Sequence, residues 1–453
     1  MNNALPQPQR ERFASGVTRS TAYRLRQLRA LRKAIIDNRQ KILTALNSDL
    51  RKCECEALLS EYRPVLSSIR FMMRRLYSFM RPQRTSLSFF NRPGSGYTIA
   101  EPYGTVLISS TWNFPFLLTM DALIAAIAAG NTVVIKLSEN SPLTSEVIQT
   151  IVRAALPEDV AAVTWLDTEE LLNQRYDMVY FIGSPEGGRR ILEKTAQFLT
   201  PTVLELGGKN PAIVTEDADL YRAARRLVWG KFLNAGQTCT APDYLLAHRS
   251  VVAELTRHMR NAIREFYGDN PQESDHFGRI ITPAHYGRLC KLLTDGRLLA
   301  GGEKEPEERY IAPTILDSVD FDTSAVMQQE IFGPILPVFC FDTLDEVVQK
   351  IQKLPKPLAI YLFSEKRKIK KYFERTTSSG SFVVNDCVVQ TPELHLPFGG
   401  VGDSGFGCCH GKYGFEAFSH RKSVLSKNPF FDWPFRYPPY GLWKTKIIRF
   451  LSK

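Results

Sequence analysis

The sequence predicts an α/β protein with a doubly wound parallel sheet of Rossmann type, followed by a second α/β unit. Between residues 104 and 198, short apolar runs typical of buried strands alternate with longer segments typical of helices. This alternation favours a parallel sheet with helices on its faces. A chain of 453 residues also exceeds the size at which one hydrophobic core keeps growing, so we expect more than one domain.

The expected elements follow this pattern along the chain. We expect an amphipathic helix with a solvated basic face over residues 20–50, a helix over 56–80 and an extended arm near 87–99. In the first unit we expect strands at 104–109, 132–136, 161–166 and 178–182 and helices at 116–129, 143–155 and 185–198. The second unit has expected strands at 211–214 and 335–339 and helices at 217–233, 251–267, 284–293 and 344–351. No GxGxxG fingerprint is present, so the pattern alone argues only weakly for a nicotinamide cofactor.

The composition indicates the cellular compartment in which the protein is expected. Hydrophobic residues make up 44% and charged residues 23% of the chain, as in soluble globular proteins. Eight scattered cysteines predict reduced thiols in an intracellular protein, and their spacing predicts no metal site. The sequence has neither a signal peptide nor an apolar run of membrane-spanning length, so we expect a cytoplasmic protein.

The formal net charge of +11 favours anionic partners. A membrane surface fits this charge better than nucleic acid, because no nucleic-acid recognition module is visible. We therefore expect no nucleic-acid partner.

One cysteine, Cys239, stands in a loop of small and polar residues, Gly236-Gln-Thr-Cys-Thr-Ala-Pro-Asp243. Such a loop can bring backbone N–H groups close to whatever reacts at the sulfur, and a few per cent of thiolate at neutral pH suffices for attack on a carbonyl carbon. Upstream, Glu205 ends an apolar strand and precedes two glycines. We predict Cys239 as the nucleophile and Glu205 as the general base.

Together with Gln329-Glu-Ile-Phe-Gly-Pro334, these segments resemble, in order, the aldehyde dehydrogenase superfamily, and the Cys239 loop is similar to its class 3, fatty aldehyde dehydrogenase-like branch. The resemblance covers about residues 20–427. It implies an aldehyde dehydrogenase-like fold with an NAD(P)-binding domain (1–82 and 103–206), a catalytic domain (207–384) and a β-ribbon oligomerisation arm (83–102 and 385–427). It also implies a homodimer.

The resemblance supplies a cofactor site residue by residue. Lys136 and Glu139 match residues that contact the adenosine ribose, Gly183 and Ser184 match a turn on the phosphate side, and Glu330 and Phe332 match residues beside the nicotinamide ribose. Read without the family, Lys136 and Glu139 are a solvated pair at a strand end. A carboxylate at Glu139 would repel a 2′-phosphate, so NAD is favoured, with NADP as the alternative.

Ser110-Thr-Trp-Asn-Phe-Pro115 resembles the segment that carries the side-chain half of an oxyanion hole. The resemblance implies that Asn113 donates to the substrate oxygen, together with the backbone N–H of Cys239. Taken alone, an asparagine before an aromatic residue and a proline is more typical of a turn.

The tail, residues 428–453, is rich in aromatic residues and ends in a short basic amphipathic segment. On one interpretation it contacts a membrane interface or covers the mouth of the active site. On the other it packs on its own subunit.

The resulting hypothesis is NAD(P)-dependent oxidation of medium- or long-chain aliphatic aldehydes to carboxylic acids, through a thiohemiacetal and a thioester on Cys239. One alternative is a CoA-acylating aldehyde dehydrogenase, in which CoA replaces water as acyl acceptor. Glu205 argues against it, since it would have no water to activate. A second alternative is a non-catalytic membrane-surface protein that keeps the fold.

Overall fold

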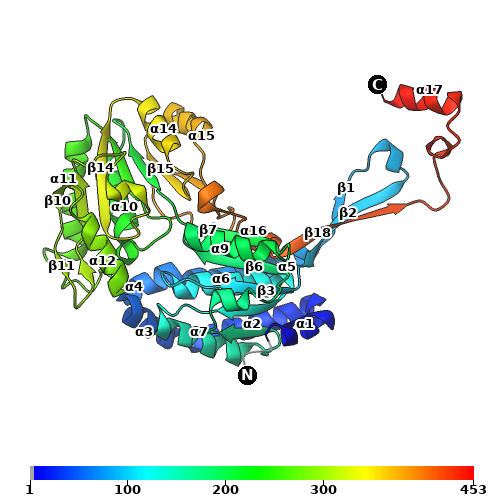
Figure 1. The fold of residues 1–453 in the computed structure, drawn as a ribbon, viewed down its shortest axis with the longest axis horizontal. Helices are drawn as coiled ribbons and strands as arrows, with labels where there is room; N and C mark the ends of the chain where they lie inside the picture. The colour runs from blue at the N-terminus through cyan, green and yellow to red at the C-terminus, as the bar shows by residue number, and fades with distance from the viewer. Residues whose placement is uncertain (1–4, 453) are drawn as a thin grey trace.

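The computed structural model describes residues 5–452. Figure 1 shows two α/β lobes side by side and a narrow ribbon that projects from one of them. The first lobe holds a six-stranded sheet of order β17-β7-β6-β3-β4-β5, and the second a seven-stranded sheet of order β10-β13-β14-β9-β8-β15-β16.

The six-stranded sheet is doubly wound. Its parallel strands are β3 (Thr105–Ser109), β4 (Thr132–Lys136), β5 (Ala161–Thr164), β6 (Met178–Gly183) and β7 (Thr202–Leu206), with β17 (Gly405–Phe406) antiparallel at the edge. From β3 the chain builds outward first through β4 and β5, then on the other side through β6 and β7. The strand order therefore reverses between β3 and β6, where open α/β sheets bind their ligands.

Helices cover both faces of this sheet. Val106 and Ile108 of β3 pack with helices α6 (Pro115–Ala129) and α7 (Pro142–Ala155), while Leu107 faces the side of α9 (Pro185–Ala196). Successive residues of a strand point to opposite faces, so a strand buried on both faces reads as one continuous apolar run. The short helix α8 (Thr168–Leu171) follows β5.

The amino-terminal helices differ from the predicted pair. The described chain begins with α1 (Gln7–Ala14), which was not predicted. The single helix expected over 20–50 is wrong. It breaks at Asn38, whose side-chain Nδ2 donates to the Ala34 carbonyl at 2.9 Å and competes with the helical backbone. The two pieces are α2 (Thr21–Asp37) and α3 (Arg39–Leu50), and α4 (Glu54–Ala57), a π-helical turn (Leu58–Tyr62) and α5 (Arg63–Met80) follow.

Arg24 corrects the prediction of a solvated basic face on the first of these helices. Its side chain is buried and donates to the Thr18 carbonyl at 2.8 Å and to the Ala128 carbonyl at 3.0 Å. The second contact lies at the carboxyl end of α6, where carbonyl groups lack helical partners and attract cations.

The second lobe contains strands that the sequence pattern did not reveal. Its parallel strands are β8 (Pro211–Val214), β9 (Tyr244–His248), β13 (Thr314–Asp317), β14 (Ile335–Phe341), β15 (Ala359–Phe363) and β16 (Ser381–Val384), with β10 (Arg297–Ala300) antiparallel. The sequence analysis assigned no strand to β9, β13 or β15. Short apolar runs do not distinguish a buried strand from part of a buried helix. The helices are α10 (Leu220–Phe232), α11 (Val252–Tyr267), α12 (Pro283–Leu292), α13 (Ala325–Gln328), α14 (Leu344–Lys353) and α15 (Arg367–Thr376), beside a small hairpin of β11 (Lys304–Glu305) and β12 (Tyr310–Ile311).

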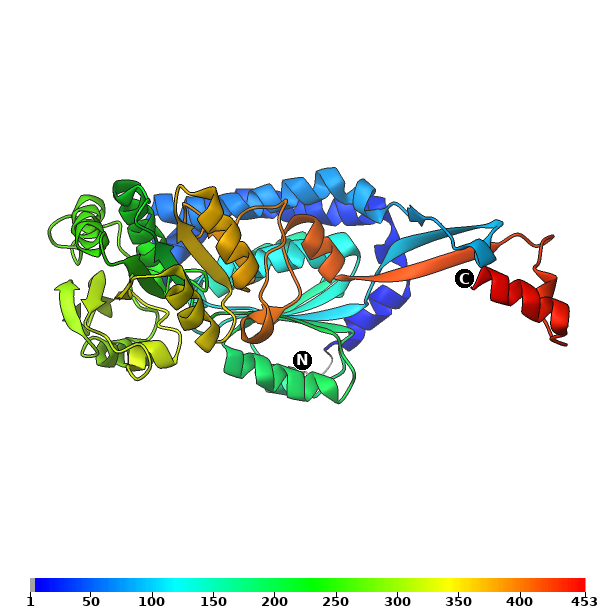
Figure 2. The same ribbon diagram turned by 90° about the horizontal axis from the view of Figure 1, so that it is seen from above.

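The ribbon joins two segments that are distant in sequence. Strand β2 (Gly94–Pro102) pairs antiparallel with β18 (Ser419–Lys427) over nine residues, and β1 (Gln83–Thr85) lies on the other side of β2. Helix α16 (Gly411–Ala417) leads into β18, and α17 (Leu442–Leu451) lies beyond the far end of the ribbon (Figure 2).

The start of the tail packs on the ribbon. The ring centroids of Trp433 and Phe89 are 4.9 Å apart, and those of Phe435 and Phe90 are 6.0 Å apart. Helix α17 itself has exposed apolar side chains, with Leu442 85% and Phe450 76% exposed. Within residues 5–452, no helix has the length and apolar character needed to cross a bilayer.

Candidate active site

The loop that carries Cys239 has an unusual backbone. After α10 the chain passes through three successive left-handed residues, Asn234 (φ 54°), Ala235 (φ 52°) and Gly236 (φ 76°). A Cβ atom at Gly236 would lie 2.3 Å from the carbonyl oxygen of Gly333, so this position requires glycine. Such backbone strain persists only where the surrounding structure fixes the chain.

Gln237 fixes this loop from within. Its Nε2 donates to the carbonyls of Asn234 at 3.0 Å and Arg279 at 2.9 Å, and its Oε1 accepts from the Ile281 N–H at 3.0 Å. The side chain is fully buried. The position of Cys239 is therefore set by hydrogen bonds to a distant segment of the second lobe.

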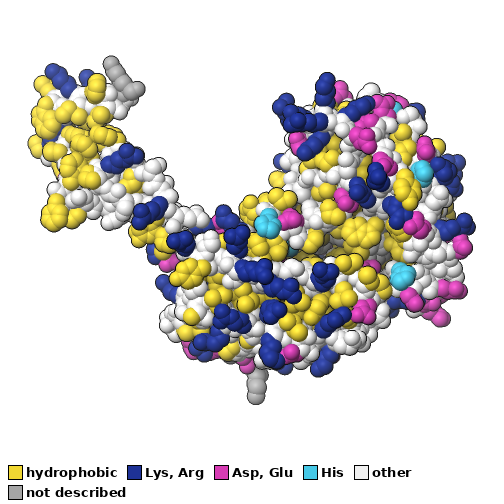
Figure 3. Space-filling view, turned by 180° about the vertical axis from the view of Figure 1, so that it is seen from behind, with side chains coloured by type: hydrophobic (Ala, Val, Ile, Leu, Met, Phe, Trp, Pro, Cys, Tyr) yellow, Lys and Arg dark blue, Asp and Glu magenta, His cyan; other side chains and the backbone are white. Residues whose placement is uncertain are grey.

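Two cavities meet at Cys239. The first, which we call the polar cleft, has a volume of about 800 Å³ and is lined by residues of both lobes. The surface is hollowed between the lobes (Figure 3). The second, which we call the apolar cavity, has a volume of about 520 Å³ and contains Cys239 and Glu56 among mainly apolar side chains. Its large apolar lining residues include Leu59, Phe114, Leu117, Trp229, Phe266 and Phe398.

The structure brings seven of the nine predicted site residues to the polar cleft. They are Asn113, Gly183, Ser184, Glu205, Cys239, Glu330 and Phe332. Lys136 and Glu139 do not line it. They lie at the carboxyl end of β4, with Lys136 Nζ 3.6 Å from Glu139 Oε1, and the Glu139 side chain is 67% exposed. The ribose contacts assigned to this pair stay a prediction.

Glu205 lies near the end of β7 and is almost fully buried. The hydroxyl of Tyr180, on the neighbouring strand β6, donates to Glu205 Oε1 at 2.5 Å. Burial raises the pKa of the Glu205 carboxyl, while the charge of His410 and hydrogen bonds from Cys409 and Tyr180 favour the ionised form. One carboxylate oxygen is therefore held, and the group is a stronger base than an exposed glutamate.

Glu330 lies across the cleft against Gly207 and Gly208. A Cβ atom at Gly207 would lie 2.0 Å from Glu330 Oε2, so the close approach depends on glycine. Burial, and then the charge of Asp243, raise the pKa of Glu330 to about 8, against the opposing effects of the Gly208 N–H and the Lys209 charge. Glu330 is thus poised to change its charge just above neutral pH.

The thiol of Cys239 is less acidic than the sequence analysis assumed. Its pKa is raised far above the usual value, first by burial and then by the negative charges of Glu330 and Glu205. The few per cent of thiolate expected at neutral pH is therefore an overestimate for this state of the protein. The thiol must therefore lose its proton before the sulfur can act as a nucleophile.

Asn113 is oriented by its own surroundings. Its Nδ2 donates to the Gln237 carbonyl at 3.1 Å, and its Oδ1 accepts from the Thr111 hydroxyl at 3.2 Å. A primary amide has two N–H groups, so one remains for a ligand.

A buried ion pair supports the backbone of this loop. Lys52 Nζ lies 2.5 Å from Glu61 Oε1 and donates to the Asn113 carbonyl at 3.0 Å. Glu61 Oε2 accepts from the first N–H groups of α6, those of Phe116 at 2.9 Å and Leu117 at 3.1 Å. The sequence analysis missed both charged residues, because nothing in the local sequence shows that the loop residue Lys52 or the helical residue Glu61 is buried.

His285 and Arg288 were also missed. His285 Nε2 lies 2.8 Å from the Phe332 carbonyl oxygen, and its ring contacts Trp112 edge to face at 5.8 Å. Burial lowers the pKa of His285 to about 4, so its ring is neutral at pH 7. Arg288 Nη1 donates to the Glu330 carbonyl at 3.3 Å, which ties α12 to the segment carrying Glu330 and Phe332.

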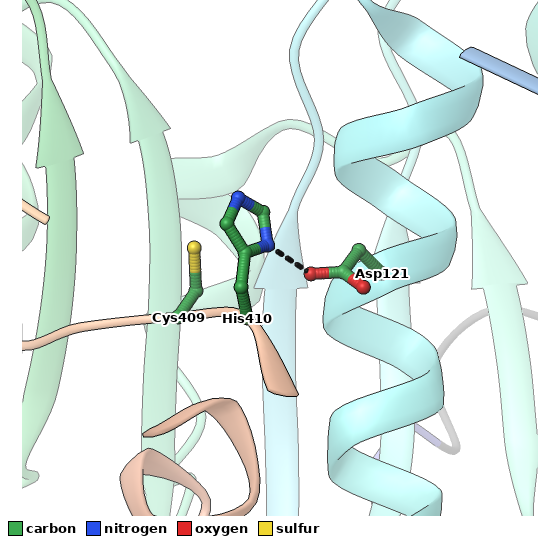
Figure 4. A group of neighbouring side chains, drawn as sticks. All are labelled: Asp121, Cys409 and His410. Atoms are coloured by element: carbon green, nitrogen blue, oxygen red, sulfur yellow. Dashed lines mark hydrogen bonds and ion pairs between the residues drawn. The ribbon is translucent and has the colours of Figure 1, made fainter. Parts of the chain in front are cut away.

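Behind Glu205, three buried residues come together: Asp121, Cys409 and His410 (Figure 4). Each offers one possible ligand atom within 4.8 Å of the others. His410 Nδ1 and Asp121 Oδ2 are already paired at 2.6 Å, so both atoms have a partner without an ion. The prediction that the protein binds no metal stays a prediction.

Comparison with known sequences identifies relatives of the chain. A sequence profile of the aldehyde dehydrogenase family matches residues 10–424. The chain is 42% identical to aldehyde dehydrogenase family 3 member H1 of Arabidopsis thaliana, over 98% of this chain and 93% of that protein. It is also 42% identical to the dimeric NADP-preferring aldehyde dehydrogenase of Canis lupus familiaris, over 95% of this chain and 96% of that protein.

Solved structures agree with this relationship. One described as the substrate-bound state of Staphylococcus aureus AldH matches with a TM-score of 0.95 and 39% identity, over 98% of each chain. An NAD+ complex of aldehyde dehydrogenase from Bacillus cereus matches with a TM-score of 0.81 and 25% identity, over 90% of this chain and 84% of that one. The predicted fold and the resemblance to the class 3 branch are confirmed. This chain belongs to the aldehyde dehydrogenase family, with family 3 members among its relatives, and is an enzyme of that family.

Proposed function

We propose that this enzyme oxidises medium- or long-chain aliphatic aldehydes to carboxylic acids with NAD as cofactor and NADP as the alternative. The observation that carries the proposal is that Cys239 lines both the polar cleft and the apolar cavity. An alkyl chain in the apolar cavity would present its aldehyde carbon to the sulfur. Burial of each methylene group there contributes about 0.8 kcal/mol to binding.

The polar cleft fits a dinucleotide. It lies at the carboxyl ends of the strands where the sheet order reverses, and it includes Ser184, the residue that caps α9. The Glu330 carboxyl suits ribose hydroxyl groups. Among the relatives, one is named NADP-preferring and a solved structure contains NAD+. When bound, the nicotinamide ring supplies the hydride acceptor for the oxidation.

In the first half of the reaction, the Cys239 thiol releases its proton to solvent water, and the resulting thiolate sulfur bonds to the aldehyde carbon to form a thiohemiacetal. The free N–H of the Asn113 amide and the backbone N–H of Cys239 stabilise the negative oxygen. The hydrogen bond from Asn113 to Gln237 supports this role, because it fixes the amide to the same loop that carries the sulfur. Loss of hydride from the carbon then leaves a thioester on Cys239.

In the second half, water attacks the thioester carbon and the Cys239 sulfur leaves. Glu205 takes the proton from this water through its second carboxylate oxygen, since Oε1 already accepts from Tyr180. The products are the carboxylic acid and the free thiol. The same role for Glu205 argues against the CoA-acylating alternative, in which no water is activated.

The decisive experiment is NAD(P)H formation by the purified protein with hexanal, a long-chain aldehyde and benzaldehyde, each with NAD and with NADP and without CoA. Turnover with aliphatic aldehydes supports the proposal. Turnover that appears only after CoA is added would overturn it in favour of the acylating enzyme. Binding of neither cofactor and no turnover would favour the non-catalytic alternative.

We infer further that the enzyme is a homodimer and that its tail makes a peripheral membrane contact. The dimer is supported by a relative named as dimeric. The membrane contact is supported by the exposed Leu442, Trp443 and Phe450 of α17, which lie beside Lys444 and other basic residues.

Co-sedimentation of the full chain with anionic phosphatidylserine vesicles tests the membrane contact. The expected result is binding that a Trp443→Ser and Phe450→Ser double variant loses. No sedimentation, together with a changed KM for aldehyde in the variant, would instead assign the tail to the mouth of the active site. Lys453, the last residue of the basic segment, lies outside the described residues.

A further inference from the structure

The cluster behind Glu205 has no part in the reaction as described so far. Asp121 comes from α6, and His410 and Cys409 follow β17 in the chain. In Figure 4 the His410 side chain lies between Cys409 and Asp121. The three residues do not line the polar cleft, and all are buried.

The pair of Asp121 and His410 is a charged contact inside the protein. Asp121 Oδ2 lies 2.6 Å from His410 Nδ1, and Asp121 Oδ1 accepts from the Ser68 hydroxyl. Burial opposes the charged imidazole, but the Asp121 carboxylate outweighs it and raises the pKa of His410. His410 Nε2 is buried without a hydrogen-bond partner in the described chain. The pair therefore favours the imidazolium form of His410, and the Nε2 edge of the ring has no carboxylate partner in the described chain.

The pairing of β17 with β7 brings the segment that contains His410 close to Glu205. Strand β17 pairs with β7 so that Gly405 lies directly opposite Glu205, and His410 follows five residues later. His410 and Glu205 each favour the charged form of the other, and Cys409 forms a hydrogen bond to the Glu205 carboxylate.

Other titratable groups also face Glu205. Tyr180 comes from β6, Cys408 and Cys409 precede His410, and Cys239 lies across the cleft. Burial raises the pKa of each of these groups, so that all four are neutral near pH 7. His410 supplies the positive charge of this set, and the negative charge of Asp121 opposes its effect on the Glu205 pKa to a smaller extent.

We propose that the Asp121–His410 pair is a positioning element for Glu205, which holds a positive charge behind the general base so that its carboxylate is ionised when the water proton is transferred. The inference rests on the proposed role of Glu205 in thioester hydrolysis. It assigns no bond-making step to His410. Asp121 acts through His410, and His410 acts through the charge state of Glu205.

The test compares the pH dependence of the two half-reactions in the full-length enzyme. Asp121→Asn keeps the size of the side chain but removes the charge that holds the imidazolium, and His410→Gln removes the imidazolium itself. Either change should raise the pKa of Glu205 and so move the acidic limb, the pH range over which steady-state turnover falls on acidification, to higher pH by about one unit. Turnover should fall by about tenfold at pH values below the wild-type limb and should be nearly unchanged well above it. The rate of the first NADH burst should stay within about twofold, because hydride transfer precedes the action of Glu205.

Matched variants separate this role from damage to the core. Ser68→Ala removes the other hydrogen bond to Asp121 and leaves the pair intact, so its acidic limb should not move. The double variant Asp121→Asn with His410→Gln should shift no further than either single change, because both remove the same charge.

Three results would overturn the inference. If the acidic limb of the pH profile is unchanged in folded Asp121→Asn, the role of the Asp121–His410 pair is overturned while the proposed function stands. An equal loss of turnover at every pH would also overturn this role, because it indicates a structural effect. If Glu205→Gln itself left thioester hydrolysis intact, the base assignment in the proposed function would fall and this inference with it.

Discussion

The two cavities that meet at Cys239 are built in different ways. The chemical groups of the polar cleft stand on short contiguous motifs near strand ends, such as Glu205 near the end of β7 and the segment with Glu330 and Phe332 before β14. The apolar cavity is assembled from side chains of distant segments, such as Leu59 and Trp229. The groups assigned to the proposed reaction therefore lie on local motifs, whereas the cavity proposed for the alkyl chain depends on the packing of separate segments.

The cavities also differ in charge. The polar cleft holds carboxyl groups next to cations and backbone N–H groups. The wall of the apolar cavity includes one carboxyl, Glu56, which accepts from the Asn234 N–H at 3.0 Å. Burial raises the pKa of Glu56 to about 7, against the opposing charge of Lys52. Even the apolar cavity therefore presents a group that changes charge near neutral pH.

The largest expected effect is at the residue that both cavities share. Cys239→Ala should lower NADH formation by more than about 10³-fold, because no other group can carry the acyl intermediate. Cofactor binding, followed by fluorescence titration, should persist. Cys340→Ala, a half-buried cysteine on β14 outside both cavities, is the control. Near-normal turnover of Cys239→Ala would break the assignment of the nucleophile.

The second test separates the halves of the reaction within the polar cleft. Glu205→Gln should slow thioester hydrolysis by about 10²- to 10⁴-fold, since general-base catalysis contributes this much. Stopped-flow absorbance should then show an undiminished burst of NADH followed by poor steady-state turnover. Glu374→Gln, at a surface carboxylate 3.5 Å from Lys370, should change neither phase. A burst that falls as much as the steady state would assign Glu205 to the first half-reaction.

The third test addresses the apolar cavity alone. Leu59→Glu places a charge on its wall and should raise the KM for a long-chain aldehyde by about 10- to 100-fold, with a much smaller effect for propanal. Leu59→Met keeps an apolar side chain of similar volume and is the control. Cofactor affinity should not change. Equal effects on both aldehydes would show that the chain does not lie against Leu59.

The smallest effect concerns the charge of Glu330. Its pKa of about 8 means that the carboxyl is mostly protonated at pH 7 and ionised at pH 9. An ionised carboxylate makes stronger hydrogen bonds to ribose hydroxyls, so cofactor affinity should rise by about fivefold across this range. Glu330→Gln should abolish the rise, as calorimetric titration at several pH values would show. A rise that persists in the variant would remove Glu330 from the cofactor contact.

The site could be predicted from the sequence only as far as its motifs are contiguous. Glu205, Cys239 and Glu330 were each found in a recognisable segment, and the structure brings all three to one cleft. Lys52, Glu61 and His285 were not found. Their importance comes from burial against the Asn113 and Phe332 segments, which a local pattern does not report.

The sequence by itself determined the alternation of strands and helices in the first lobe, the small and polar loop that carries Cys239, and the family resemblance. These features depend on residues that are neighbours in the chain, where side-chain size, glycine and proline restrict the backbone directly. Only the tertiary structure decided the break at Asn38, the burial of Arg24, the raised pKa of the Cys239 thiol and the pairing of His410 with Asp121. Each of these depends on which distant groups exclude water or supply charge, and that is fixed only when the lobes pack together.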